Sequence, residues 1–424
     1  MELKKYKLGE IADFNKENIG STDKFTVIEY LDTSSITENV ISGISFLNIS
    51  DAPSRAQRKV TNNTIIYSTV RPRLKHYGIL FSPKNNLIVS TGFVTIDVKD
   101  IFKDKIDARY LFLLLTQANI TEYIGNIADT AVSAYPSINP TDISSIYFNF
   151  PDIQIQKIIS DIWFNYDSKI ELNRAINQNL EAMAKQLYDY WFVQFDFPDE
   201  NGRPYKSSGG KMVWNEKLKR DIPISWETKL IDDVAEIYNG ATPSTINELN
   251  YGGDIVWITP KDLSDQKQKF VYKGERNISQ VGYDSCSTHL LPSNTILMSS
   301  RAPIGLLAIA KTELCTNQGF KSFVPKSGNT AIYLYYYLQH HIRQVEQLGT
   351  GTTFKEVSRE DILKFPILKP SDNVLDLWEE MVSPLNDRQL EIQKENESLT
   401  KQRNELLPHL MNGQISVNSD LSDD

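Results

Sequence analysis

Cysteine is nearly absent from this sequence of 424 residues, which contains only Cys286 and Cys315. The two cysteines form no CxxC pair, so neither the ligand spacing of a zinc site nor the cysteine pattern of a disulfide framework is present. We therefore expect two ordinary reduced thiols and no metal centre.

Long apolar runs are also missing. No stretch approaches the roughly 18 apolar residues that a bilayer-spanning helix needs. The first residues, MELKKYKLGE, contain no apolar core of a secretory signal. With 40% hydrophobic and 10% aromatic residues, the composition is typical of a folded globular protein. The sequence predicts a cytoplasmic protein without a membrane segment.

The short motifs that accompany common enzyme chemistry are absent as well. The sequence has no GxxxxGK[ST] loop, no GxGxxG fingerprint, no HExxH and no GxSxG. It also lacks an Asn-Pro-Pro-aromatic motif of the kind that holds a flipped base in amino-methyltransferases. Neither Pro151-Asp152 nor Pro198-Asp199 is followed by the acid-x-Lys of a nuclease. We therefore predict a protein with no catalytic residues of its own.

What the sequence does contain is an internal repeat, whose second copy begins roughly 220 residues after the first. Each copy opens with a short amphipathic segment, LGEIADF from Leu8 and LIDDVAEI from Leu230. Each then has an apolar strand that runs into a basic turn, TIIYSTVRPR from Thr64 and TILMSSRAPIG from Thr295. The match resumes at Gly92-Phe93 and Gly319-Phe320, at RYLFLLL from Arg109 and IYLYYYL from Ile332, and at PTDISSI from Pro140 and REDILKF from Arg359. Two copies predict two similar sites.

The net charge of −9 argues against a nucleic-acid partner, but the charges are unevenly distributed. There is no acidic residue between Ala52 and Ile96, where the basic residues are Arg55, Arg58, Lys59, Arg71, Arg73, Lys75 and Lys84. Lys and Arg neutralise DNA phosphates, so this stretch is a candidate DNA-facing surface, and a solvated basic face is the alternative. The matching stretch from Ser285 to Thr312 is also free of acids but has only Arg301 and Lys311.

Each copy is followed by a long helical pattern. From Ile153 to Phe195, after the helix start predicted by Pro151-Asp152, apolar residues recur at intervals that alternate between three and four. Lys169 and Asn173 interrupt this pattern in its middle. The stripe expected in the second half of this helix comprises Ile176, Leu180, Met183 and Leu187. In the second helix, apolar residues recur every seven residues at Leu385, Ile392, Leu399 and Leu406. The other position of the same seam, called the companion position here, is polar at Gln389, Asn396 and Arg403.

These two helices are expected to pack against each other as an antiparallel coiled coil, and a plain helical hairpin within a larger core is the alternative. A helix of about 40 residues spans roughly 60 Å. That length exceeds one turn of B-DNA, about 34 Å. The pair is therefore long enough to act as a ruler on DNA.

The remaining parts of each copy combine short β-rich runs with one apolar helix, from Tyr110 to Tyr123 or from Tyr333 to Gln347. Gly, Pro and Asn separate the runs. We predict a mixed α/β (α+β) fold class, in which each copy is a twisted, partly closed sheet with a helix or two packed on it.

The segment between the copies is FDFPDENGRPYKSSGGKMVWNEKLKRDIPISW, from Phe195 to Trp226, and the helix before it ends in LYDYWFVQF. Together they closely resemble the central conserved region of the specificity subunits of type I restriction-modification systems (HsdS). The terminal ENESLTKQRNELLPHLMNGQI is similar to their second conserved region, and the likeness covers the whole chain. Within the central segment, we expect Trp191, Trp214 and Trp226 to hold the loop against an apolar surface.

The resemblance implies five regions. Residues 1–150 form target recognition domain 1, and residues 151–222 form the central conserved region. Residues 223–370 form target recognition domain 2, and residues 371–417 form the C-terminal conserved helix. Residues 418–424 are expected to be a disordered acidic tail.

The resemblance also implies a function. Each recognition domain is expected to read one half of a bipartite, asymmetric site in double-stranded DNA, while the two helices set the unread spacer. An approximate internal two-fold symmetry would match the dyad of DNA. The subunit itself is expected to have no cofactor. Its expected partners are two methyltransferase subunits, which use S-adenosylmethionine, and through them two restriction subunits, which use ATP and Mg.

Two readings from other classes compete with this one. The first is a coiled-coil adapter that assembles proteins and has no role in reading DNA. The second is a DNA-modifying enzyme with a degenerate active site, against which weak binding of S-adenosylmethionine by the isolated chain would count.

Candidate DNA contacts are Arg and Lys beside planar amides and hydroxyls at the junctions of strands and loops. In the first domain they are Arg71, Arg73 and Lys75, and in the second they are Lys261, Arg301, Gln318 and Lys321. Tyr135 and Lys355 complete the set, because they lie in matching loops, SAYPS and TTFKE, that the repeat places on the same face.

Overall fold

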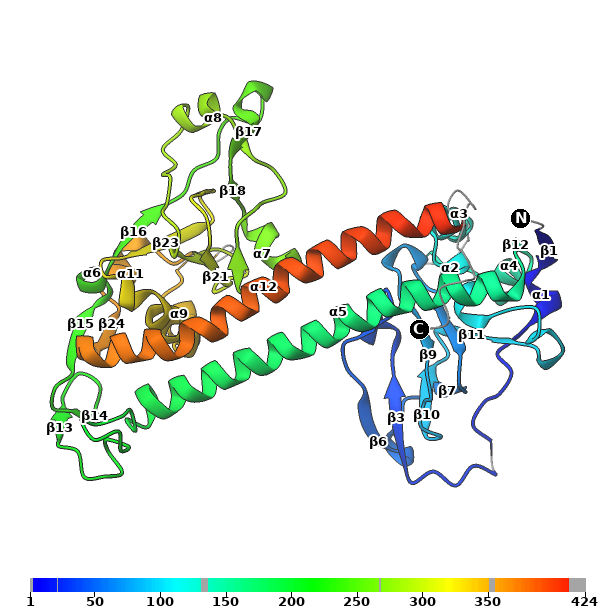
Figure 1. The fold of residues 1–424 in the computed structure, drawn as a ribbon, viewed down its shortest axis with the longest axis horizontal. Helices are drawn as coiled ribbons and strands as arrows, with labels where there is room; N and C mark the ends of the chain where they lie inside the picture. Colours follow the sequence, from blue (N-terminus) through cyan, green and yellow to red (C-terminus); the bar gives the residue numbers. More distant parts are fainter. Residues whose placement is uncertain (1–2, 21, 131–135, 267, 351–354, 412–424) are drawn as a thin grey trace, which may run out of the picture. The chain divides into compact units, whose positions relative to one another are not determined.

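The computed structural model describes residues 3–20, 22–130, 136–266, 268–350 and 355–411. The chain divides into two compact units, of which unit 1 comprises Met1–Ile170 with Leu399–Asp424 and unit 2 comprises Glu171–Ser398. Each unit contains one copy of the repeat and parts of both long helices, α5 (Ile153–Tyr188) and α12 (Asp372–Met411), which are drawn in Figure 1. Among the described residues, no helix is long and apolar enough to cross a membrane.

The first module contains two four-stranded sheets. One sheet has the spatial order β6 (Ser45–Asn48), β3 (Val27–Leu31), β10 (Leu87–Ser90) and β7 (Ala56–Lys59). The other has the order β2 (Ala12–Phe14), β11 (Phe93–Val98), β8 (Thr64–Ser68) and β9 (Tyr77–Leu80). Two strand pairs complete the module: β1 (Lys4–Lys7) with β12 (Tyr147–Phe150), and β4 (Ile36–Thr37) with β5 (Val40–Ile41).

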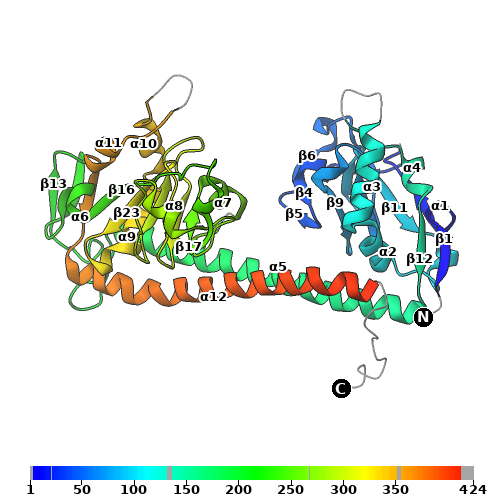
Figure 2. The same ribbon diagram turned by 90° about the horizontal axis from the view of Figure 1, so that it is seen from above.

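Among the residues described in this module, the α-helices are α1 (Leu8–Ile11), α2 (Ala108–Leu115), α3 (Ala118–Asp129) and α4 (Pro140–Ser144). Helix α2 begins where the Asp107 carboxylate accepts hydrogen bonds from the backbone amides of Arg109 and Tyr110. Its side chains from Tyr110 to Leu115 are all buried. Figure 2 shows α2 and α3 alongside β9 and β11. The buried helix and this sheet form the core of the module.

The prediction of a single sheet is wrong for the first module. The chain passes from β10 to β11 through Thr91 and Gly92 only. The pairing of β10 with β7 shifts its register between Val89 and Ser90. Such a bulge bends a strand and re-aims the chain. The bend at this point sends β11 into the second sheet instead of extending the first.

The second module repeats the sheet on which α2 packs. Strands β16 (Ala235–Asn239), β23 (Phe320–Pro325), β20 (Ile296–Ser299) and β21 (Leu307–Ala310) stand in the order of β2, β11, β8 and β9, and β19 (Phe270–Val271) adds an edge. The parallel pair β18 (Trp257–Ile258) and β22 (Cys315–Thr316) matches the parallel pair β3 and β10. Phe93 pairs with Ser68, and Phe320 pairs with Ser299. The predicted repeat is thus confirmed at the level of strand order and register.

The other elements of unit 2 complete this module and the central segment. The helices are α6 (Ile231–Val234), α7 (Pro260–Gln266), α8 (Gln280–Asp284), α9 (Ala331–His340), α10 (Ile342–Gln347) and α11 (Arg359–Leu363). The strands are β13 (Met212–Asn215) paired with β14 (Arg220–Pro223), β15 (Glu227–Leu230) paired with β24 (Pro366–Lys369), and β17 (Tyr251–Ile255).

Each module shares its core with both long helices. In unit 1, Ile159 of α5 and Leu410 of α12 belong to the same buried cluster as the side chains of α2. In unit 2, Trp378 of α12 and Tyr188 of α5 belong to the same buried cluster as α9. The beginning of one helix and the end of the other are therefore part of each module. This arrangement confirms the predicted fold class of two mixed α/β modules joined by long helices.

The two helices contact each other through polar side chains, and they run antiparallel. In unit 2, Asn173 Nδ2 donates hydrogen bonds of 3.0 Å to Glu395 and Asn396. Further along, Gln389 Nε2 donates to the backbone carbonyl of Asn177 over 3.2 Å. The companion positions predicted at Gln389 and Asn396 are therefore confirmed as part of the seam.

The same seam continues in unit 1. Arg403 Nη1 pairs with the Asp167 carboxylate at 2.7 Å, and its guanidinium lies 5.0 Å from the centre of the Trp163 ring. The Tyr166 hydroxyl faces Gln402 at 3.4 Å. Arg403, the third predicted companion position, thus also lies in the seam.

The apolar stripe predicted for the second half of α5 is only partly correct. Ile392 is fully buried, and the half-buried members are Ile176, Leu180, Leu187, Leu385, Leu399 and Leu406. Met183, however, is 55% exposed. At about 100° per residue, Met183 shares its side of the helix with Leu172, roughly 100° away from Asn173, which faces α12. Spacing alone does not decide which of two neighbouring faces is buried.

Two of the three tryptophans in the central segment lie where the sequence predicts. Trp191 and Trp226 are each 3% exposed and belong to the core of unit 2. The prediction for Trp214 is wrong, because this side chain is 53% exposed and its Nε1 donates to Glu216 at 2.9 Å. It lies on the short hairpin of β13 and β14, where its neighbour Val213 is exposed as well.

Candidate nucleic-acid interface

In the first module, a tight basic turn follows β8. Arg71 and Lys75 adopt left-handed backbone conformations with φ of 49° and 58°, on either side of a single helical turn at Pro72–Leu74. The returning chain clamps this turn, because the Arg71 amide donates to the Pro136 carbonyl at 2.9 Å. Arg71, Arg73 and Lys75 are exposed. The turn thus presents three cations from a fixed backbone.

Two of these cations contact carboxylates from other parts of unit 1. Arg73 Nη2 donates to Asn126 at 2.6 Å and to Asp129 at 3.0 Å, both on α3. Lys75 Nζ pairs with Glu38 at 2.5 Å. Both cationic side chains remain about half exposed. Exposed pairs of this kind contribute little stability, so we interpret them as contacts that orient the cations.

Carboxylates also surround the rest of the acid-free stretch from Ala52 to Ile96. Lys59 pairs with Asp23 at 3.0 Å, and Lys84 pairs with Glu29 at 2.5 Å. The backbone amide of Gly20 and the Lys59 ammonium lower the pKa of Asp23. A stretch without acids in the sequence is therefore not without acids in space.

In the second module, three segments meet at Gly319, just before β23. The Ser300 amide donates to the Gly319 carbonyl at 2.8 Å, which brings the basic turn with Arg301 to this point. A Cβ atom on Gly319 would lie 2.8 Å from Pro260 Cγ, so glycine permits the close approach of α7, which carries Lys261. The structure thus brings Lys261, Arg301 and Gln318 to one place.

Glu356 organises the cations of this cluster. Arg301 Nε pairs with one of its oxygens at 3.0 Å, and Lys321 Nζ pairs with the other at 3.3 Å. The Arg301 side chain is 50% exposed, whereas that of Lys321 is 7% exposed. Lys321 is therefore placed to hold Glu356, and it does not present its charge to solvent. Lys355, which precedes Glu356, is exposed.

Lys261 and Gln318, the other two predicted residues of the second module, are exposed. Lys261 pairs with Glu275 at 2.8 Å, which raises the pKa of the lysine. The Gln318 carbonyl accepts a hydrogen bond from the Thr242 hydroxyl. Tyr135 lies outside the described residues.

The two modules build this region in the same way. In each, the residue after β8 or β20 donates to a glycine carbonyl: Thr69 to Gly92 at 2.9 Å and Ser300 to Gly319 at 2.8 Å. In each, the returning chain bonds to the basic turn: Ile138 to Thr69 at 2.9 Å and Val357 to Ser300 at 3.1 Å. The described ends of the two returning segments thus meet the basic turns through equivalent backbone hydrogen bonds.

Arg55 is a further candidate DNA contact that was not predicted from the sequence. Arg55 is exposed, and its carbonyl accepts a hydrogen bond from the Thr91 amide at 2.8 Å. This contact places Arg55 beside Gly92, where the chain passes from β10 to β11. The only sequence feature that pointed to Arg55 is its position in the acid-free stretch from Ala52 to Ile96. Nothing in the sequence shows that this strand end lies next to the glycine.

Within the described ranges, no group of three or more His, Cys, Asp or Glu side chains is arranged to hold a metal ion. Burial raises the pKa of the Cys315 thiol to about 11, which keeps this group protonated at neutral pH.

Comparisons with known proteins agree with the arrangement. The family model of the type I restriction modification DNA specificity domain matches residues 1–182 and 223–399. The type I restriction enzyme HindI specificity subunit from Haemophilus influenzae is 28% identical over an alignment 468 positions long, which covers 98% of this chain and 100% of that protein. The type I restriction enzyme MjaIX specificity subunit from Methanocaldococcus jannaschii is 38% identical over 197 residues, 45% of this chain and 46% of that protein.

A solved structure supports the fold. The S subunit of a type I restriction-modification system from M. genitalium superposes with a TM-score of 0.59 at 15% identity, covering 96% of both chains. Taken with the repeated modules and the match of the family model to most of the sequence, this chain belongs to the family of type I restriction-modification specificity subunits, and its two modules are target recognition domains.

Proposed function

We propose that each recognition domain reads one half of a bipartite, asymmetric DNA site and that α5 and α12 set the length of the unread spacer. The observation that carries this proposal is the duplication of the candidate interface. In each module a basic turn bonds to a glycine, Gly92 or Gly319, and the chain that returns toward the long helix bonds to the same turn. Two equivalent readers on one chain suit a target with two separate halves.

The exposed cations divide into groups suited to phosphates and groups suited to bases. Arg301 uses Nε for its contact with Glu356, and its terminal amino groups are those that bind guanine O6 and N7. Gln318 offers an amide beside it, the group that reads adenine. Lys75, Lys261 and Lys355 are point charges and suit phosphate oxygens, whose contacts position a module without reading sequence.

The chain is proposed to hold no cofactor and to perform no chemistry itself. Methyltransferase subunits would bring S-adenosylmethionine, and restriction subunits bound through them would bring ATP and Mg. We propose two copies of each in the complete assembly, one methyltransferase for each half-site.

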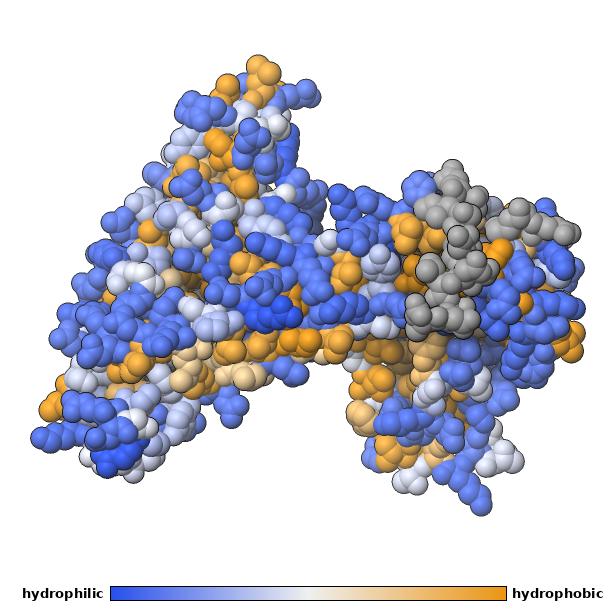
Figure 3. Space-filling model, in the orientation of Figure 1, coloured by the Kyte–Doolittle hydropathy of each residue, from blue (hydrophilic) through white to orange (hydrophobic). Residues whose placement is uncertain are grey.

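A row of apolar side chains on α5 is the surface that we assign to a methyltransferase subunit. Leu172 and Met183 are 56% and 55% exposed, and Ile176 lies between them on the same side of the helix. Figure 3 shows apolar atoms in a row over α5. Exposed apolar rows of this kind mark contacts with other proteins.

Replacement of Arg301 by Ala is expected to weaken recognition of one half-site and to leave the other unchanged. A bidentate arginine contact with guanine contributes about 1–3 kcal/mol of discrimination. Relative methylation of DNA substrates with single base changes in either half would measure the effect. Arg388→Ala is the control, because this arginine lies on α12 and makes an exposed pair with Glu391. An equal loss of discrimination in both halves would contradict the modular assignment.

The function itself is tested by co-expressing the chain with its methyltransferase subunit in a host without DNA methylation and mapping N6-methyladenine across the genome. We expect a split motif with a fixed gap, together with copurification of the two subunits. A stable complex without methylation, and without sequence-dependent DNA binding, would favour the adapter without a DNA-reading role.

A further inference from the structure

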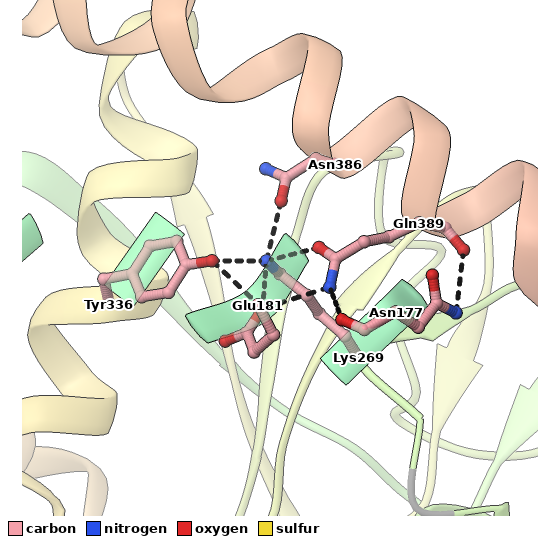
Figure 4. Close-up of polar contacts among 6 residues, drawn as sticks. All are labelled: Asn177, Glu181, Lys269, Tyr336, Asn386 and Gln389. Atoms are coloured by element: carbon pink, nitrogen blue, oxygen red, sulfur yellow. Dashed lines mark hydrogen bonds and ion pairs between the residues drawn. The ribbon is translucent and has the colours of Figure 1, made fainter. Parts of the chain in front are cut away.

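Unit 2 contains a buried lysine that neither the interface nor the helix seam explains. Lys269 precedes the edge strand β19, and its side chain is 9% exposed. Its ammonium lies 2.9 Å from the Glu181 carboxylate, 2.6 Å from the Tyr336 hydroxyl, 2.6 Å from Asn386 Oδ1 and 3.2 Å from Gln389 Oε1 (Figure 4). These partners come from α5, α9 and α12. One residue of the second recognition domain thus binds both long helices.

The network fixes the orientation of the Lys269 ammonium group as well as its distance from each partner. An ammonium group has three N–H donors, and the three shortest contacts of Lys269 point to three different elements. Tyr336 also donates to Glu181 at 3.1 Å, which fixes the carboxylate. The segment after Lys269 follows α12, because Gln393 Nε2 donates to the Phe270 carbonyl at 2.9 Å.

Unit 1 has a contact at the matching place, with the charges arranged differently. Asp167 and Asn386 are each the fifteenth residue of their helix, counted from 153 to 167 and from 372 to 386. Asn39 of the first domain donates to Asp167 at 3.2 Å, and the cation beside it, Arg403, comes from α12. In unit 2 the cation comes from the recognition domain and the anion from α5.

The network is poorly suited to provide stability. Burial lowers the pKa of Lys269 to about 8, although the Glu181 carboxylate opposes that shift. Desolvation therefore outweighs the attraction of the ion pair. Buried ion pairs of this kind are often replaceable by apolar residues without loss of stability, and their best attested role is to fix register.

We propose that Lys269 is a positioning residue that fixes how the second recognition domain sits on its helices and thereby restricts the spacer lengths that the subunit accepts. This inference rests on the proposed function, because it needs two readers at a set separation. It assigns the control of accepted spacer lengths to the hydrogen-bond network of Lys269 inside unit 2.

The test is Lys269→Met, which keeps the length of the side chain and removes its charge. The matched control is Lys273→Met, since Lys273, whose side chain is 56% exposed, joins the same segment to the same helix through its pair with Glu397. Each full-length variant, in complex with the methyltransferase subunit, would be assayed for its rate of methylation on three DNA substrates. These carry the native spacer, a spacer one base pair shorter and a spacer one base pair longer. The readouts are the ratio of the three rates, the base preference in each half-site and the unfolding temperature.

We expect Lys269→Met to reduce the preference for the native spacer by about tenfold, in line with the loss of hydrogen bonds to a charged group. Base preference in the first half-site, and the spacer preference of Lys273→Met, should not change. If Lys269→Met does not assemble, the double variant Glu181→Gln with Lys269→Met, which leaves no unpaired carboxylate, should show the same relaxation.

An unchanged spacer ratio in either assembled variant would overturn the inference while leaving the proposed function intact. An equal loss in Lys269→Met and Lys273→Met would also overturn it, because a general loosening of the segment would then explain both. Failure of the unmodified complex to methylate any split motif would instead overturn the proposed function, and the inference with it.

Discussion

Adding one helical turn to both α5 and α12 should lengthen the gap of the recognised DNA motif by one to two base pairs. Four residues extend a helix by about 6 Å, and a base pair occupies about 3.4 Å. Because two methyltransferase sites must align with two half-sites, methylation of the original spacing should fall about 100-fold. Methylome mapping of the unmodified and the lengthened subunits would measure both effects.

The contacts between the helices determine where the turns should be added. An insertion beside Asn177 would separate it from Gln389, so the better place in α5 is after Ser168, between Asp167 and Asn173. The matching place in α12 is after Thr400, between Asn396 and Arg403, since these residues contact Asn173 and Asp167. The control is an insertion in α5 alone, which puts the seam out of register and should abolish methylation. A lengthened pair that still methylates only the original spacing would rule out the helices as the ruler.

Replacement of Trp378 by Ala should destabilise unit 2 by about 3–5 kcal/mol, as for other large core aromatics. Trp378 is fully buried, and its ring centroid lies 5.0 Å from that of Phe192 and 6.0 Å from that of Tyr188. It is the point at which α12, the end of α5 and helix α9 share one core. Denaturant unfolding of the full chain, followed by tryptophan fluorescence and by circular dichroism, would measure the loss.

Trp214→Ala is the matched control, because this tryptophan is 53% exposed on the hairpin of β13 and β14. Its free energy of unfolding should stay within about 0.5 kcal/mol of the unmodified chain. A similar loss in both variants would show that the aromatic cluster around Trp378 is not what joins the helices to the second domain.

The repeat was readable from the sequence, because its signals are local. An apolar strand, a basic turn and a glycine before an aromatic residue recur in the same order, and β8 and β20 pair with β11 and β23 in the same register. The long helices were readable for a similar reason. Their apolar spacing and the start after Pro151-Asp152 are features of neighbouring residues.

What the sequence did not reveal depends on contacts between distant segments. The cations of the acid-free stretch contact Asp23, Glu29 and Glu38, which precede that stretch, and Asp129, which follows it. The Lys269 network joins four segments, and no one of them carries a motif. Lys321 appears in the sequence as a cation after a glycine, and only the fold shows that it is buried against Glu356.

The carboxylates beside the interface cations also bear on how the subunit behaves on DNA that lacks its target. Binding of Lys and Arg to DNA normally gains free energy from ions that leave the duplex. Where a carboxylate such as Glu356 or Asp129 already neutralises the cation, contact with a phosphate frees that carboxylate, which then takes up an ion from solution. We therefore expect a paired cation to release fewer ions than a free one, which would lower both the affinity for arbitrary sequence and its dependence on salt. On this expectation, stable binding requires contacts with bases that compensate for the ion pairs broken on DNA.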